Sequence, residues 1–100
     1  MQTALQVTFR SLSASPALEA RIRDKAAKLE SLHPQLTRCR VTIEQRHRHQ
    51  HQGRQFAVRL QVRTPGHDIV VSLEHDEDVH VALRDAFDAA ERQLEAVYEN

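Results

Sequence analysis

The sequence has 100 residues, 40% of them hydrophobic, and a single cysteine, which fits one small globular domain and excludes an intramolecular disulfide framework. Its charges cancel overall, yet residues 1–63 hold 12 Lys/Arg and 4 Asp/Glu, whereas residues 64–100 hold 2 and 10. This split of +8 and −8 predicts either a basic surface beside an acidic one or two halves that neutralise each other within the fold.

The first half of the chain predicts a strand, a helix and a second strand. Apolar and polar residues alternate near 3–10, which indicates a half-buried strand. Ser15 followed by Pro16 is a helix-start signal, and His33-Pro34 ends a helix near 16–32. The core face of this helix would consist of Leu18, Ile22, Ala26 and Leu29. Alternation resumes near 37–47, where Cys39 shares the inward face with the apolar residues.

The second half predicts two more strands and a long amphipathic helix. Alternation near 54–64 and 67–75 indicates strands, separated by the turn signal Pro65-Gly66. Apolar residues then recur at intervals of three and four over 77–98, as on one face of a helix. Asp76 is the expected cap of this helix. The residues expected to be buried together are Val41, Ile43, Val58, Leu60, Leu83 and Phe87.

These elements predict an α+β fold of order β-α-β-β-β-α. The first two strands should be parallel and the others antiparallel, giving a four-stranded mixed sheet. Because each strand alternates rather than being apolar throughout, we expect both helices on one face and solvent on the other. Residues 1–100 should form a single domain.

The last helix also carries a family resemblance. The segment EDVHVALRDAFDAAERQL resembles the final helix of the ribosome hibernation-promoting factor family, which includes ribosome-associated inhibitor A. The matching positions are Glu77, Asp78, Val79, Ala82, Leu83, Arg92, Gln93 and Leu94. The order of elements matches over the whole chain as well. The resemblance implies this fold in a short form, without the second domain of longer relatives.

By this resemblance, the chain would bind small-subunit ribosomal RNA near the decoding region and inhibit translation under stress. Attachment would be electrostatic and inhibition steric, with no cofactor and no enzymatic activity. Lys25, Lys28 and Arg92 match basic positions of the family's helices, whereas Ala89 and Ala96 stand where typical members have lysines. With the basic stripe of the first helix and the hairpin arginines, the predicted RNA-binding residues are Arg21, Lys25, Lys28, Arg46, Arg48, Arg54 and Arg92.

The open face of the sheet is another candidate for phosphate binding, because alternation turns a set of arginines outward. These are Arg10, Arg38, Arg40, Arg59 and Arg63. Guanidinium groups pair well with phosphate. The alternative is that these arginines simply lie on a sheet face exposed to solvent. The absence of aromatic residues among these arginines argues against a base-stacking platform.

Metal binding and catalysis are two further functions that the residues bear on. His47, His49 and His51 would lie on one side of an extended segment, as metal ligands can, but Arg46, Arg48 and Arg54 in the same loop would repel a cation. With two glycines there is no glycine-rich phosphate loop, and the serines near residue 13 lack a nucleophile context. We therefore expect neither a metal site nor catalysis.

The alternative from another class is a module that has lost ribosome binding. The +8 and −8 halves can drive recognition of another protein or formation of a homo-oligomer. No apolar run reaches the length of a membrane span, and the lone cysteine fits a reducing compartment, so we expect a cytoplasmic protein without a membrane partner.

Overall fold

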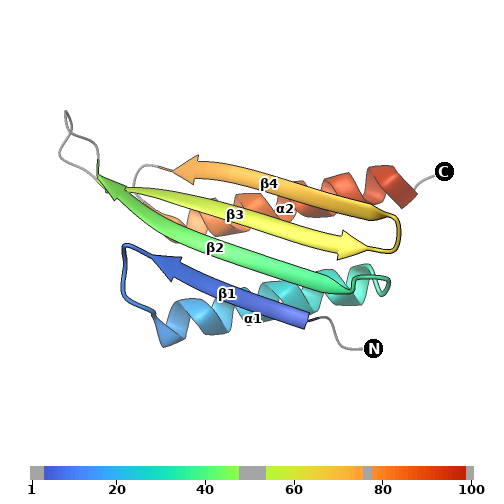
Figure 1. Ribbon diagram of the computed structural model, residues 1–100, viewed down its shortest axis with the longest axis horizontal. Helices are drawn as coiled ribbons and strands as arrows, with labels where there is room; N and C mark the ends of the chain where they lie inside the picture. The colour runs from blue at the N-terminus through green and yellow to red at the C-terminus, as the bar shows by residue number, and fades with distance from the viewer. Residues whose placement is uncertain (1–3, 48–53, 76–77, 99–100) are drawn as a thin grey trace.

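The computed structural model describes residues 4–47, 54–75 and 78–98, and it confirms the predicted order of elements. The strands are β1 (Ala4–Arg10), β2 (Arg38–His47), β3 (Arg54–Thr64) and β4 (His67–His75). The helices are α1 (Pro16–Leu32) and α2 (Val79–Tyr98). Figure 1 shows the four strands side by side with both helices behind them.

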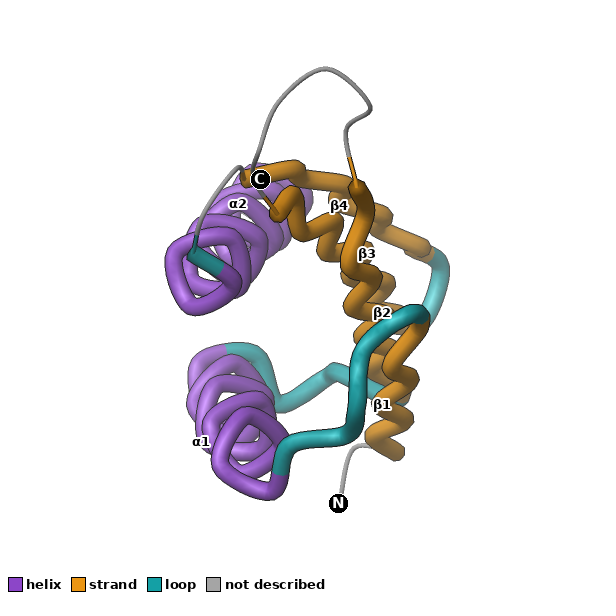
Figure 2. The backbone as a smooth tube through the Cα atoms, turned by 90° about the vertical axis from the view of Figure 1, so that its left-hand side faces the viewer, coloured by secondary structure: helices purple, strands orange, loops and turns teal. Residues whose placement is uncertain are grey.

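The sheet has the order β1-β2-β3-β4, so each strand pairs with its neighbour in sequence. β1 and β2 are parallel, whereas the other two pairs are antiparallel, as predicted. Figure 2 shows both helices on one side of the sheet and no described element on the other side. The mixed α+β architecture with one open sheet face is therefore confirmed.

Local signals explain where α1 begins and ends. The Ser15 side chain accepts a hydrogen bond from the Leu18 backbone N–H at 3.2 Å, and Pro16 occupies the first helical position, where a missing N–H costs nothing. At the other end, the His33 N–H donates to the Leu29 carbonyl at 2.8 Å. Pro34 follows and cannot continue the helix.

The start of α2 differs from the prediction by two residues. Asp76 was expected as the cap, but it lies outside the described residues, and the helix begins at Val79. Asp78 caps it instead, because its carboxylate accepts hydrogen bonds from the N–H groups of His80 at 2.9 Å and Val81 at 3.4 Å. Three consecutive residues, 76–78, are acidic, and sequence does not show which of them adopts the cap conformation.

The core lies between the sheet and the helices. The register places Cys39 opposite Val62, Val41 opposite Leu60 and Ile43 opposite Val58, and none of these six side chains is more than 1% exposed. The predicted helix face is buried too, since Leu18, Ile22, Ala26 and Leu29 are at most 8% exposed. Leu83 and Phe87 of α2 complete the core at 0% and 6% exposure.

Two features outside this core tie down the turn and the end of the chain. Gly66 has φ of 85° in the β3–β4 turn, a conformation that favours glycine. Near the end of α2, the Tyr98 hydroxyl lies 2.6 Å from the Thr64 hydroxyl, within hydrogen-bonding distance, and the tyrosine ring packs edge-on against His67. Within the described ranges, neither helix is long and apolar enough to cross a membrane.

Candidate nucleic-acid interface

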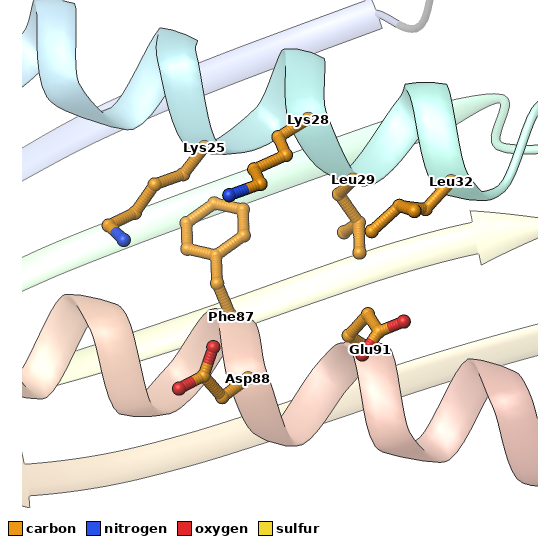
Figure 3. Close-up of a pocket in the computed structure, with 7 residues that line it drawn as sticks. All are labelled: Lys25, Lys28, Leu29, Leu32, Phe87, Asp88 and Glu91. Atoms are coloured by element: carbon orange, nitrogen blue, oxygen red, sulfur yellow. The ribbon is translucent and has the colours of Figure 1, made fainter.

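A groove of about 230 Å³ separates α1 from α2 on the helix-covered side. Lys25, Lys28, Leu29 and Leu32 line it from α1, and Phe87, Asp88 and Glu91 line it from α2. In Figure 3, the two lysines extend from α1 toward α2, and the ring of Phe87 points from α2 toward α1. The helical period explains this placement, because residues 25, 28 and 32 share a face beside the buried stripe.

The charges in this groove are mixed but not mutually paired. Neither Lys25 nor Lys28 lies within 4.0 Å of a carboxylate oxygen of Asp88, Glu91 or any other described acid. The geometry therefore does not support neutralisation of the basic half by the acidic half at these two lysines. The two ammonium groups remain available to an external anion.

Glu91 instead approaches the end of α1. The buried Nε2 atom of His33 lies 3.5 Å from Oε1 of Glu91, but no hydrogen bond forms at this atom. The contact places the residue that follows α1 beside the middle of α2, where Glu91 is partly buried and Asp88 is exposed.

The remaining predicted residues on the helices lie outside the groove lining. Arg21 is exposed on α1, one turn before Lys25, and so extends the basic stripe along the helix. Arg92 is exposed on α2. Arg84, also on α2, pairs with Asp85 at 3.2 Å.

Of the hairpin arginines, Arg46 does not join the lysines. Arg46 is exposed on the open face of the sheet, where its Nε donates to Glu44 Oε1 at 2.9 Å. It lines a second hollow of about 390 Å³ on that face. Arg48 lies outside the described residues, and of Arg54 only the backbone position at the start of β3 is described. The structure thus places Arg46 on the opposite side of the sheet from Lys25 and Lys28.

The histidine segment that was considered as a metal site lies largely outside the described residues. His49 and His51 lie outside them, and His47 is described only as the last backbone position of β2. In the part of the chain that the structure describes, no group of three potential ligands could hold a metal ion. The expectation that these histidines hold no metal therefore stays a prediction.

Cys39 behaves as the alternation predicted. It is 1% exposed on the helix-covered face, and burial raises the pKa of its thiol from an ordinary 9.0 to about 12. A neutral, enclosed thiol is a weak nucleophile. Cys39 therefore belongs to the core and not to a reactive site.

The site prediction missed the apolar part of the groove. Phe87 was assigned to the core only, and Leu32, which is 57% exposed, was not singled out. The periodicity of α1 already placed Leu32 four residues after Lys28, on the same side. That spacing was the signal that could have included it.

Comparison with known proteins identifies a family that the chain matches. A family model described as Sigma 54 modulation protein / S30EA ribosomal protein matches residues 5–99. No curated protein sequence matches the chain significantly.

Two solved structures share the fold. A ribosomal subunit interface protein from Coxiella burnetii superimposes with a TM-score of 0.82 at 17% identity, over 98% of this chain and 100% of that one. The Protein Y N-terminal domain from Thermus thermophilus gives 0.80 at 21% identity, over 96% and 99%. With the family match over nearly the whole chain, the predicted resemblance is confirmed: this chain belongs to the Sigma 54 modulation protein / S30EA ribosomal protein family, the ribosome-associated family of the hibernation-promoting factors.

Proposed function

We propose that this chain is a cytoplasmic translation inhibitor that binds small-subunit ribosomal RNA near the decoding region under stress. Its family supports association with the ribosome. The observation that carries RNA binding is the groove between α1 and α2, where Lys25 and Lys28 extend toward α2 without a described acid in ion-pair range. Ammonium groups held in this way suit the phosphate oxygens of an RNA backbone.

The acids of the same groove limit how RNA enters it. Asp88 and Glu91 repel phosphate, so the backbone should follow the α1 side, along Arg21, Lys25 and Lys28. The two carboxylates can then accept hydrogen bonds from ribose 2′-hydroxyls or from base amino groups. The groove therefore favours RNA in one orientation, with the backbone against α1 and hydrogen-bond donors against α2.

Inhibition needs no chemical step in this account. The Cα trace measures 46 × 27 × 17 Å, which is the bulk that a bound domain would bring to the decoding region. Occupancy of the decoding region then excludes messenger or transfer RNA sterically. In this proposal, Arg46, Arg48, Arg54 and Arg92 complete the attachment by contacts with further phosphates.

Sedimentation with purified 30S subunits tests the proposal. The variant Lys25→Gln/Lys28→Gln removes two positive charges from the groove. The matched control is Arg23→Gln/Arg84→Gln, which removes two positive charges from exposed arginines that pair with Glu19 and Asp85. We expect the groove variant to bind more weakly and the control to bind as the wild type does.

The dependence of affinity on salt adds a quantitative readout. Loss of two phosphate contacts should reduce the slope of log affinity against log salt by about 1.4 to 1.8. A wild type that does not sediment with 30S subunits at low salt would contradict the proposal. If the groove variant and the control had equal slopes of log affinity against log salt, the groove would not be the RNA-binding site.

The alternative, a protein-interaction or self-associating module, predicts different behaviour. The acids on the exposed face of α2 and the arginines on the open sheet face have opposite charge, so copies could associate head to tail. Analytical ultracentrifugation of the protein alone distinguishes the two functions. Salt-sensitive oligomers without any ribosome binding would favour the alternative.

A further inference from the structure

The open face of the sheet carries a dense set of positive charges. Its described arginines are all exposed: Arg10, Arg38, Arg40, Arg46, Arg59 and Arg63. The acids described on the same face are Glu44 and Asp68. No described element covers this face, as the edge-on view in Figure 2 shows. The sheet therefore presents an excess of positive charge on a rigid support.

Most of these arginines are not neutralised within the described fold. Arg46 pairs with Glu44 at 2.9 Å, and Arg63 lies 3.7 Å from Asp68. In contrast, four arginines have no described acid within ion-pair distance: Arg10, Arg38, Arg40 and Arg59. Their guanidinium groups can bind an external anion without first breaking an internal salt bridge with a described acid.

The register adds a cost that a merely solvated face would avoid. Arg38 lies directly opposite Arg63, and like charges in that position destabilise a sheet. Arg40 lies between Gln6 and Gln61, neutral side chains that leave its charge uncompensated. An anion bound along this face would relieve the repulsion.

The arrangement fits a phosphate backbone. Arginines two positions apart along a strand are separated by about 6.6 Å, which is comparable with the spacing of successive phosphates along a nucleic acid strand. The hollow of about 390 Å³ on this face brings Arg10, Arg46 and Arg59 together with the hydroxyl side chains of Thr42 and Ser72. Guanidinium and hydroxyl groups are both donors to phosphate oxygens.

We propose that the open sheet face is a second RNA-binding surface, which holds a phosphodiester backbone through Arg10, Arg38, Arg40 and Arg59. The face lies on the opposite side of the sheet from the helix groove, so the domain binds two separate RNA segments at once. This inference rests on the proposed function for the choice of RNA as the polyanion. No aromatic side chain accompanies these arginines on the described part of the face, so recognition is of the backbone and not of base sequence.

The first test uses a twelve-nucleotide oligouridine as the probe and backbone amide NMR as the readout. We expect salt-sensitive shifts in the amides of β2 and β3 around Arg40 and Arg59. The variant Arg40→Gln/Arg59→Gln should reduce these shifts, whereas the charge-matched control Arg23→Gln/Arg84→Gln should leave them unchanged. Shifts confined to α1 and α2 would overturn the inference.

The second test uses 30S subunits and the same two variants. Loss of two phosphate contacts should lower the salt slope by about 1.4, so the drop in affinity between 50 and 200 mM salt should become about sevenfold smaller. Wild-type slope and affinity in the sheet variant would overturn the inference while leaving the proposed function standing. If the protein binds the oligouridine through the sheet but does not bind 30S subunits, the inference stands and the proposed function is contradicted.

Two remaining outcomes also decide the matter. If the wild type binds neither RNA, the inference fails together with the proposed function. If the sheet variant abolishes self-association of the protein alone but leaves RNA binding intact, the face recognises a protein and the inference is overturned. Melting temperatures of all variants, measured alongside, show that the exposed substitutions leave the fold intact.

Discussion

The two faces of the sheet differ in almost every physical respect. The helix-covered face buries Val41, Ile43, Val58 and Leu60 to 1% exposure or less. The open face, formed by the alternate residues of the same strands, carries arginines that repel one another. One face thus provides stability, while the other provides exposed positive charge. Substitutions on the two faces should therefore have separable effects on stability and on binding.

The largest effect is expected from Phe87→Ala. Phe87 is 6% exposed, and its removal leaves a cavity between α2 and the rest of the core. Large-to-small changes of this kind cost about 3–5 kcal/mol in the free energy of unfolding. Chemical denaturation measures the loss. Val70→Ala on the open face is the control, since Val70 is 43% exposed and its removal should change stability by no more than about 0.5 kcal/mol. Equal losses for both variants would refute the assignment of faces.

The next effect concerns the reactivity of Cys39. Because burial raises the pKa of its thiol from 9.0 to about 12, the reactive thiolate should be about a thousandfold rarer in the folded protein than in the unfolded one. Labelling with a thiol reagent should therefore be slow until denaturant is added. Ser72→Cys in a Cys39→Ala background places the thiol on the open face and should label rapidly. Fast labelling of native Cys39 would reverse the orientation of β2.

The same pKa shift predicts how stability depends on pH. The folded state favours the neutral thiol, so this contribution to stability is complete below the ordinary pKa of 9.0. It is lost as the pH rises toward 12. Cys39→Ala should remove this part of the alkaline loss, which chemical denaturation at several pH values would reveal.

A smaller effect is expected at the cap of α2. Asp78→Ala removes the carboxylate that accepts from the His80 N–H, which should cost about 0.5–2 kcal/mol. Asp78→Asn keeps an acceptor and should recover most of the loss. Asp76→Ala serves as the comparison, because the sequence alone suggested that residue as the cap. If Asp76→Ala proved the more damaging change, the helix start assigned here would be wrong.

The smallest effect on stability belongs to the open face. Arg40→Gln/Arg59→Gln should change the free energy of unfolding by no more than about 0.5 kcal/mol, because both side chains are exposed and neither pairs with a described acid. Thermal melting provides the measurement. A loss of several kcal/mol would mean that these arginines stabilise the fold and would end the separation of roles between the faces.

Sequence alone predicted the fold because its signals are local. Period-two alternation assigned Cys39, Val41 and Leu60 to the core face, and the Ser15-Pro16 start placed α1. The cap of α2 was misplaced because a run of acids offers several equivalent candidates. Local patterns fix which face a residue occupies, but they do not rank similar residues in a row.

The candidate site was harder to predict because it depends on tertiary packing. Periodicity showed that Lys25 and Lys28 share a stripe, but not that Asp88 and Glu91 lie across a groove from them. Arg46 was grouped with those lysines by charge, yet alternation in β2 turns it to the opposite side of the sheet. Charge counts along a chain do not separate two surfaces that a single sheet divides.

The most direct test of the account measures 30S binding against salt for four proteins. These are the wild type, Lys25→Gln/Lys28→Gln, Arg40→Gln/Arg59→Gln and the combined variant. We predict that each double substitution lowers the salt slope by about 1.4 and that the combined variant lowers it by about 2.8, with nearly unchanged melting temperatures. Slopes that are the same for all four proteins would contradict the claim that this domain binds ribosomal RNA through both the helix groove and the open sheet face.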